Sequence, residues 1–316
     1  MGIVHGTLGF VFPGQGSQSV GMLRDLAAHH AEIQQVFAEA SEVLGFDLWE
    51  LVCDGPEEDL NRTENTQPAM LAADVAVWRV WTVCSEIRPA WMAGHSLGEY
   101  SALVCANAIS FEDAVRLVRA RGRLMQNAVP PGDGAMAAIL GLEDERLVQL
   151  CKSTSMPGGV VSAANFNAPG QVVIAGHSAA VRRVVDRAKS EGAKRSVVLP
   201  VSVPSHCSLM TDAAESLNPI LANTPCYPPQ TPVLHNVDVA VHESPDEIRS
   251  ALVAQMYRSV RWSETVKSMC AKGVNRFVEC GPGKVLSGLS KRIAPDCSVY
   301  STGDEESLTK AKESVQ

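Results

Sequence analysis

Positive charge, long hydrophobic runs and closely paired cysteines are all scarce in this sequence. It has 27 Lys and Arg against 35 Asp and Glu, which gives a formal net charge of -8 over 316 residues. A nucleic-acid surface needs dense positive charge, so this balance argues against a general nucleic-acid partner. No apolar stretch approaches bilayer length, and residues 1–7 contain no Lys or Arg ahead of an apolar run. We therefore expect a cytoplasmic protein with no nucleic-acid or membrane partner.

The nine cysteines are scattered along the chain and include no Cys-x-x-Cys pair. That spacing is unlike the disulfide framework of a small secreted domain, so we expect reduced, mostly buried thiols and no metal site. The remaining composition, with 46% hydrophobic and 20% charged residues, is ordinary for a globular enzyme and is sufficient for a sizeable core.

The pattern of the chain changes near residue 130. Before it, the apolar segment 7–12 predicts a buried strand, and 13–18 predicts a loop that leads into a helix reaching about residue 30. After it, the periodicity predicts a strand, a helix, two strands, a helix and a strand. These elements occupy residues 135–140, 143–151, 160–164, 171–175, 178–190 and 195–199.

The β-α-β-β-α-β order is the ferredoxin-like topology, which can fold as a compact insert. We therefore predict a small domain at residues 130–200, inserted into a larger domain made of residues 1–129 and 201–316. Helical stretches alternate with short apolar runs after residue 200, which indicates α/β layers in the larger domain. The tail after Thr302, rich in Glu, Lys and Ser, is expected to be frayed.

The segment Gly94-His95-Ser96-Leu97-Gly98 contains a serine with glycine at both second neighbours. This spacing is typical of a sharp strand-to-helix turn that exposes a nucleophilic hydroxyl, and it also occurs in tight glycine turns with an incidental serine. An apolar segment precedes it and a helical segment follows it, as the nucleophile turn requires. Ser96 is therefore the candidate nucleophile.

A serine hydroxyl needs a base, and His206 is the candidate. It follows Pro204-Ser205 at the start of a predicted helix, and the order nucleophile then histidine matches α/β-hydrolase sites. The alternative for any single histidine is a structural or surface role. An oxyanion hole would need two N–H donors: the Leu97 amide supplies one, and Gln15, between two glycines, is the natural source of the other.

Arg121 lies in a helix with Arg119 and Arg123, which are four residues apart and share a side. Three arginines in five residues usually form a solvated face. Arg121 points well away from the other two, and an arginine turned inward near an active serine would make a bidentate site for a carboxylate.

Seven motifs in order along the chain resemble those of the bacterial malonyl-CoA:acyl carrier protein transacylases of fatty acid synthesis. They are Phe12-Pro13-Gly14-Gln15-Gly16-Ser17-Gln18, Gly94-His95-Ser96-Leu97-Gly98-Glu99-Tyr100, Arg121-Gly122, Gly134-Ala135-Met136-Ala137-Ala138, Asn165-Phe166-Asn167-Ala168-Pro169-Gly170-Gln171, Val203-Pro204-Ser205-His206-Cys207 and Gly281-Pro282-Gly283-Lys284-Val285-Leu286. The resemblance spans nearly the whole chain. It implies a hydrolase-like α/β core with a ferredoxin-like insert, malonyl-CoA as substrate, acyl carrier protein as partner, and no cofactor.

The resemblance also implies roles by position. Ser96 would be acylated, His206 would act as general base and then acid, and Arg121 would bind the malonyl carboxylate. Gln15 and Leu97 would bind the oxyanion, and the Gln255 main-chain carbonyl would orient the histidine in place of a triad aspartate.

Several alternatives stay open at this point. Ser205 lies where related polyketide acyltransferases vary with extender unit, so a methylmalonyl donor or a polyketide carrier is possible. A serine thioesterase would share the turn and the histidine but would have no use for a buried arginine. A non-catalytic carrier-binding scaffold would need the loss of Ser96 or His206, and both residues are present. The chain carries no ketosynthase or carrier segment, which favours a stand-alone enzyme, and a monomer is the default expectation.

Overall fold

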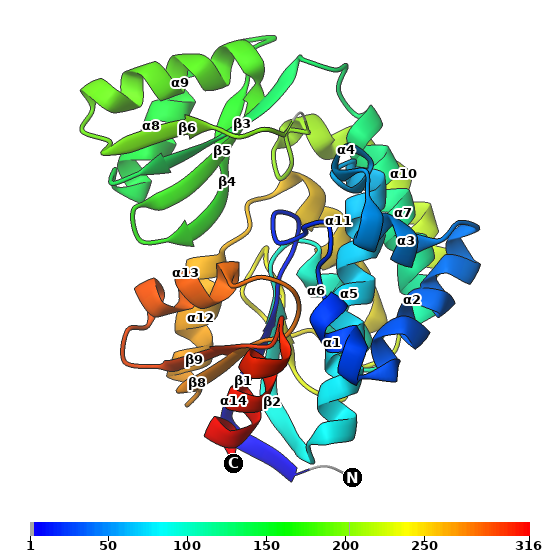
Figure 1. Ribbon diagram of the computed structural model, residues 1–316. Helices are drawn as coiled ribbons and strands as arrows, with labels where there is room; N and C mark the ends of the chain where they lie inside the picture. The colour runs from blue at the N-terminus through cyan, green and yellow to red at the C-terminus, as the bar shows by residue number, and fades with distance from the viewer. Residues whose placement is uncertain (1–2, 202) are drawn as a thin grey trace.

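A five-stranded parallel sheet forms the centre of the larger part of the molecule (Figure 1). The computed structural model describes residues 3–201 and 203–316. The strand order is β7-β2-β1-β8-β9, and every neighbouring pair is parallel. The strands are β1 (Ile3–Phe12), β2 (Ile87–Gly94), β7 (Val233–Leu234), β8 (Arg276–Glu279) and β9 (Ser298–Ser301).

Helices cover both faces of this sheet, as an all-parallel sheet requires. Phe10 and Phe12 of β1 point into a large core shared with the helices on one face, where Phe10 packs edge-on against Trp81. Val11 points the other way, into a core that contains Trp262. The helices of this part are α1 (Arg24–His29), α2 (Ala31–Leu44), α3 (Leu48–Asp54), α4 (Glu57–Leu60), α5 (Thr63–Cys84), α6 (Gly98–Cys105), α7 (Phe111–Asn127), α10 (Thr211–Asn223), α11 (Pro245–Tyr257), α12 (Trp262–Ala271), α13 (Val285–Ile293) and α14 (Glu305–Val315), with the 3-10 helix η1 (Ser208–Met210).

A second, four-stranded antiparallel sheet lies above the first in Figure 1, with two helices on its outer face. Its order, β4-β5-β3-β6, is that of a ferredoxin-like unit. Its elements are β3 (Gly134–Leu140), α8 (Asp144–Thr154), β4 (Val161–Ala168), β5 (Gln171–His177), α9 (Ser178–Ser190) and β6 (Arg195–Val198). The predicted α/β class with an inserted β-α-β-β-α-β unit is confirmed. The exact domain boundaries, 130–200 within 1–129 and 201–316, stay a prediction.

The two faces of the antiparallel sheet bury different sets of side chains because residues alternate along a strand. Val172 and Ile174 pack against α8 and α9, whereas Met136 and Val173 face the larger part of the molecule. Backbone hydrogen bonds also join the two parts: Phe166 N–H donates to the Val260 carbonyl at 2.9 Å, and Val260 N–H donates to the Ala164 carbonyl at 2.8 Å.

Two local predictions differ from the structure. The sequence predicts a loop over residues 13–18 followed by a helix, whereas the loop extends to residue 23 and the first helix, α1, begins at Arg24. The tail after Thr302 was expected to fray, and this is wrong: α14 is a helix whose N-terminus is capped by the Asp304 carboxylate, which accepts from Ser307 N–H at 2.7 Å. The buried residues Leu308, Ala311 and Val315 recur at helical spacing, so burial of one apolar stripe holds the otherwise polar segment.

The crossing of α5 and α7 depends on Gly122. A Cβ at this position would lie 2.7 Å from the Thr63 carbonyl oxygen and 2.8 Å from the Glu64 Cα. Gly122→Ala is therefore expected to lower the free energy of unfolding by roughly 1–3 kcal/mol through overpacking, as measured by chemical denaturation.

Gly288 provides the matched control, because it lies in α13 and an added Cβ would have, among the described residues beyond its own stretch of helix, no neighbour within 4 Å. Gly288→Ala should leave the stability unchanged or raise it by about 0.5–1 kcal/mol. Equal losses in both variants would contradict the close approach of α5 and α7.

Candidate active site

The site lies where three neighbouring parallel strands end. In open α/β sheets the carboxyl ends of the strands meet at one edge, where ligands bind. Here β1 leads into the loop that contains Gln15, β2 leads into Ser96, and β7 ends beside them. These strands are adjacent in the sheet, which brings residues distant in sequence to one place.

Ser96 adopts the sharp turn that its flanking glycines indicate. Its φ is 53°, in the left-handed region that residues other than glycine rarely adopt. A Cβ at Gly94 would overlap the backbone of Gly98, and a Cβ at Gly98 would overlap the Phe12 carbonyl. Only glycine at both positions allows α6 to begin this close to the end of β2. The hydroxyl of Ser96 is thereby held out from the turn.

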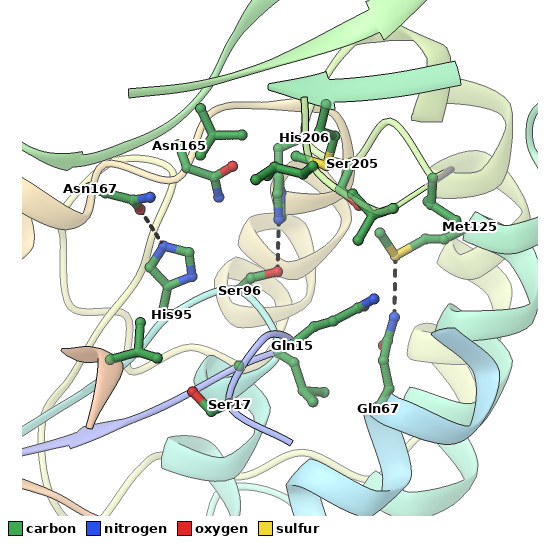
Figure 2. A pocket seen from close by; sticks show the side chains of 18 of the residues that line it. Gln15, Ser17, Gln67, His95, Ser96, Met125, Asn165, Asn167, Ser205 and His206 are labelled. Atoms are coloured by element: carbon green, nitrogen blue, oxygen red, sulfur yellow. Dashed lines mark hydrogen bonds between the residues drawn. The ribbon is translucent and has the colours of Figure 1, made fainter. Parts of the chain in front are cut away.

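His206 contacts the Ser96 hydroxyl directly, as Figure 2 shows. Its Nε2 lies 2.7 Å from the Ser96 Oγ, and its Nδ1 lies 2.7 Å from the Gln255 carbonyl oxygen. A carbonyl only accepts, so Nδ1 carries the proton and donates it, while Nε2 is free to accept the serine proton. Burial lowers the His206 pKa to about 3, with a further contribution from the Arg121 charge. The imidazole is therefore uncharged at neutral pH, with Nε2 unprotonated and able to accept the serine proton.

The lowered pKa of His206 predicts that the reaction rate of Ser96 stays nearly constant as the pH falls from 7 to 5. A His206 pKa of about 3 keeps the base neutral as the pH falls, so phosphonylation of Ser96 by a fluorophosphonate should slow by less than about twofold between pH 7 and pH 5. An imidazole with the ordinary pKa near 6.5 would lose about 25-fold over that interval. Rates measured in a pH series, with circular dichroism to confirm folding, distinguish the two, and a midpoint near 6.5 would contradict the effect of burial.

Arg121 is a buried cation next to the nucleophile. Its side chain is 1% exposed and extends from α7 toward Ser96. Nη2 donates to the Ser96 Oγ at 3.2 Å and to the Gln255 Oε1 at 2.9 Å, and Nη1 donates to the Gln67 Oε1 at 2.8 Å. Among the described residues its side-chain hydrogen-bond partners are neutral, so its charge has no carboxylate partner within hydrogen-bonding distance.

The predicted arrangement of the three arginines of α7 agrees with the structure. Arg119 and Arg123 both lie near Glu64, at 3.9 Å and 3.1 Å, on a different side of the helix from Arg121. Arg123 is exposed and Arg119 is partly buried, whereas Arg121 is fully buried and extends toward Ser96.

The loop after β1 lies against the turn that contains Ser96. Gly14 approaches the His95 carbonyl so closely that a Cβ would overlap it, and this Cβ position is 3.6 Å from the Leu97 amide nitrogen. In the described part of the chain, neither the Gln15 nor the Leu97 N–H donates to a backbone acceptor in a turn or loop. Both amides are thus available near Ser96, and their service as an oxyanion hole stays a prediction.

These side chains surround a cavity of about 230 Å³ between the two sheets. The residues that line it include Gln15, Ser96, Leu97, Arg121 and His206. Gln255 is hydrogen-bonded to three of these, namely Ser96, Arg121 and His206. The structure thus brings all six predicted site residues together.

The smaller sheet and the linker that follows it supply the opposite wall of the cavity. This wall consists of Met136, Asn165, Asn167, Val173, Leu199, Val201 and Val203. His95 reaches across to this wall, where its Nε2 lies 2.8 Å from the Asn167 Oδ1 (Figure 2).

Sequence reasoning missed Gln67 and the side chain of Gln255, which together hold the Arg121 guanidinium. Gln67 is buried in α5 beside Met125, where its Nε2 lies 3.5 Å from the sulfur. A buried glutamine inside an apolar helix was the available signal, because buried amides need partners.

Within residues 3–201 and 203–316, no group of three or more His, Cys, Asp or Glu side chains is placed to hold a metal ion. Within the same ranges, no helix combines the length and the apolar character needed to cross a membrane.

Comparisons with known proteins agree with this geometry. A family model described as acyl transferase domain matches residues 9–294. The malonyl CoA-acyl carrier protein transacylase of Escherichia coli (strain K12) is 54% identical over 304 residues, covering 96% of this chain and 98% of that protein.

Solved structures are equally similar. An acyl carrier protein S-malonyltransferase from Vibrio cholerae is 56% identical with a TM-score of 0.94, over 97% of this chain and 100% of that chain. In a solved complex of a type II PKS acyl-carrier protein with its malonyl-transacylase, the matching chain is 54% identical with a TM-score of 0.96, over 97% of this chain and 99% of that chain. The chain therefore belongs to the acyl transferase domain family and, within it, to the malonyl-CoA:acyl carrier protein transacylases.

Proposed function

We propose that this protein transfers the malonyl group from malonyl-CoA to the phosphopantetheine thiol of acyl carrier protein, through a malonyl ester on Ser96, and so supplies fatty acid elongation. The observation that carries the proposal is the charge of Arg121, which is buried beside the Ser96 hydroxyl and has, in the described part of the chain, no carboxylate within hydrogen-bonding distance. A buried cation without a counter-ion is costly, and a substrate carboxylate would compensate it. Malonyl-CoA provides a carboxylate at the end of a short acyl group.

In the first half-reaction the Ser96 Oγ attacks the thioester carbonyl, and His206 Nε2 takes the hydroxyl proton. The negative charge that develops on the carbonyl oxygen would be bound by the Gln15 and Leu97 amides. When the C–S bond breaks, coenzyme A takes the proton from His206 and leaves as a thiol. The Gln255 carbonyl keeps the imidazole oriented at 2.7 Å throughout.

In the second half-reaction the carrier thiol gives its proton to His206 and attacks the ester carbonyl. Ser96 then leaves and recovers its proton, so one thioester is exchanged for another. Water would compete with the thiol, and the apolar wall of the cavity formed by residues such as Met136, Val173 and Leu199 reduces its access.

The proposal extends to partners and location. No cofactor is needed for this chemistry, and malonyl-CoA is a substrate. Exposed basic side chains on or next to α9, β6 and α13 are candidates for contact with an acidic carrier protein. They are Arg182, Lys189, Lys194, Arg195, Lys284, Lys291 and Arg292. The nine free thiols favour a reducing compartment, and we propose a cytoplasmic monomer.

Incubation with labelled malonyl-CoA tests the proposal. We expect a stable label on Ser96 that acyl carrier protein discharges as malonyl-carrier. Rapid release of free malonate would instead indicate a serine thioesterase, and absence of label would indicate a non-catalytic carrier-binding protein.

The choice of acyl group and carrier is tested in the same assay. Ser205 lines the cavity beside His206, so it can affect the fit of a branched donor. Faster loading from methylmalonyl-CoA than from malonyl-CoA, or discharge only by a polyketide carrier, would redirect the proposal within the same reaction class.

A further inference from the structure

We propose that Asn236 is a positioning residue that holds the Ser96 turn in its reactive conformation, and that Glu99 in turn positions Asn236. The inference rests on the proposed function only in that Ser96 is the nucleophile. Asn236 comes two residues after the end of β7 and does not line the cavity. It is fully buried, as is Glu99.

The Asn236 side chain bridges the two sides of the turn. Its Oδ1 accepts from the Ser96 N–H at 2.7 Å, and its Nδ2 donates to the Gly94 carbonyl at 2.7 Å. One amide therefore fixes both the peptide group that enters Ser96 and the end of the strand that precedes it.

Glu99 connects Asn236 back to the helix that follows Ser96. It lies in the first turn of α6, three residues after Ser96, and its Oε2 accepts from the Asn236 backbone N–H at 2.8 Å. Its Oε1 lies 2.8 Å from Nδ1 of the buried His235. The helix that follows Ser96 thus binds, through the Glu99 carboxylate, the loop from which Asn236 contacts Ser96.

The need for such a clamp follows from the backbone conformation. Ser96 has a φ of 53°, which an L-residue keeps only when its surroundings enforce it. Rotation of the peptide group before Ser96 would move the Oγ away from His206 Nε2, now 2.7 Å distant, and would turn the following amide away from the oxyanion position. The rate of acyl transfer would then fall, whereas the cavity that binds the acyl donor would keep its shape.

Asn236→Ala tests the clamp directly. We expect kcat for malonyl transfer to fall about 10²-fold, as for a misplacement of reacting groups by about 1 Å. The KM for malonyl-CoA should stay within about threefold of the parent value, because the variant leaves the Arg121 site in place. A change confined to KM, or a kcat within about threefold of the parent, would overturn the proposal.

Ser101→Ala is the matched control. Ser101 is also fully buried in α6, but its Oγ donates to the Asp74 Oδ2 at 2.7 Å and not to the Ser96 turn. We expect a comparable loss of thermal stability with kcat within about threefold of the parent. A loss of kcat as large as that of Asn236→Ala would mean that general destabilisation explains both.

Glu99 supplies a second pair of variants that keeps the proposal testable if Asn236→Ala does not fold. In Glu99→Gln the side-chain oxygen can accept from the Asn236 N–H, and its NH₂ can donate to His235 Nδ1 once that ring changes tautomer. Glu99→Ala loses both contacts. We expect Glu99→Gln to retain most of kcat and Glu99→Ala to lose it; equal activity in the two variants would contradict the role of Glu99.

A fluorophosphonate separates this inference from the proposed function. The reagent forms an Oγ–P bond with Ser96, fluoride leaves, and His206 takes the proton, so its rate reports the turn whatever the natural acyl donor is. We expect Asn236→Ala to slow this reaction in parallel with kcat. Unchanged labelling overturns the clamp, whereas slow labelling in a protein that transfers no malonyl group leaves the clamp and removes the proposed function.

Discussion

Ser96→Ala is expected to lower malonyl transfer at least about 10⁴-fold and to abolish the labelled acyl-enzyme. The hydroxyl oxygen is the atom that becomes acylated, and it lies 2.7 Å from His206 Nε2. Within residues 3–201 and 203–316, no other serine or cysteine side chain is hydrogen-bonded to the His206 ring. His206→Ala should cause a loss of similar size, because the hydroxyl is a weak nucleophile without a base. Single-turnover measurement of malonyl loading reports both effects.

The two losses should not add. Nucleophile and base act as one unit, so the double variant should be about as impaired as either single variant. Ser208→Ala, which changes an exposed serine near His206 in sequence, serves as the control and should keep full activity. Retention of a serine-linked label in Ser96→Ala would show that another residue is the nucleophile.

Arg121→Ala should produce the second large effect, a change in acyl preference. Loading from malonyl-CoA is expected to fall about 10³-fold, equivalent to about 4 kcal/mol of transition-state stabilisation, since the substrate carboxylate loses a buried bidentate partner. Loading from acetyl-CoA should fall by no more than about tenfold, which allows for the lost 3.2 Å contact between Arg121 and the Ser96 Oγ. The ratio of the two kcat/KM values is therefore the informative quantity.

Two variants check this assignment. Arg119→Ala removes a neighbouring arginine of α7 that lies 3.9 Å from Glu64, and it should leave both donors unaffected. Arg121→Lys keeps the charge but not the planar pair of donors, so it should restore malonyl loading only in part. Equal losses for malonyl-CoA and acetyl-CoA in Arg121→Ala would show that the arginine supports Ser96 and does not select the acyl group.

The inserted sheet was predictable because its signals are local. Apolar alternation and helical spacing repeat over short segments, and the observed strands and helices lie within a few residues of those expected. The C-terminal helix was missed for the opposite reason. Its polar composition conceals three apolar residues, Leu308, Ala311 and Val315, whose stabilising partners lie elsewhere in the chain.

The residues of the site also differ in whether a local sequence pattern reveals them. Ser96 and its glycines are recognisable because the turn imposes its requirements within five residues. Gln67 reaches Arg121 from another helix, 54 residues away, and Asn236 reaches Ser96 from 140 residues away. A polar amide within an apolar segment indicates only that it needs a partner. Which residue it contacts is determined by its position in space and not by its neighbours in sequence.

The two walls of the cavity have a consequence for redesign. The reactive turn with Ser96 and the loop with Gln15 come from the edge of the parallel sheet, where Gly94 and Gly98 leave no space for a side chain. The facing wall comes from the antiparallel sheet and its linker, with Met136, Val173 and Leu199 among its members. Libraries aimed at new acyl groups can therefore vary that wall while the reactive turn stays untouched, so selectivity and rate can be engineered as separate traits.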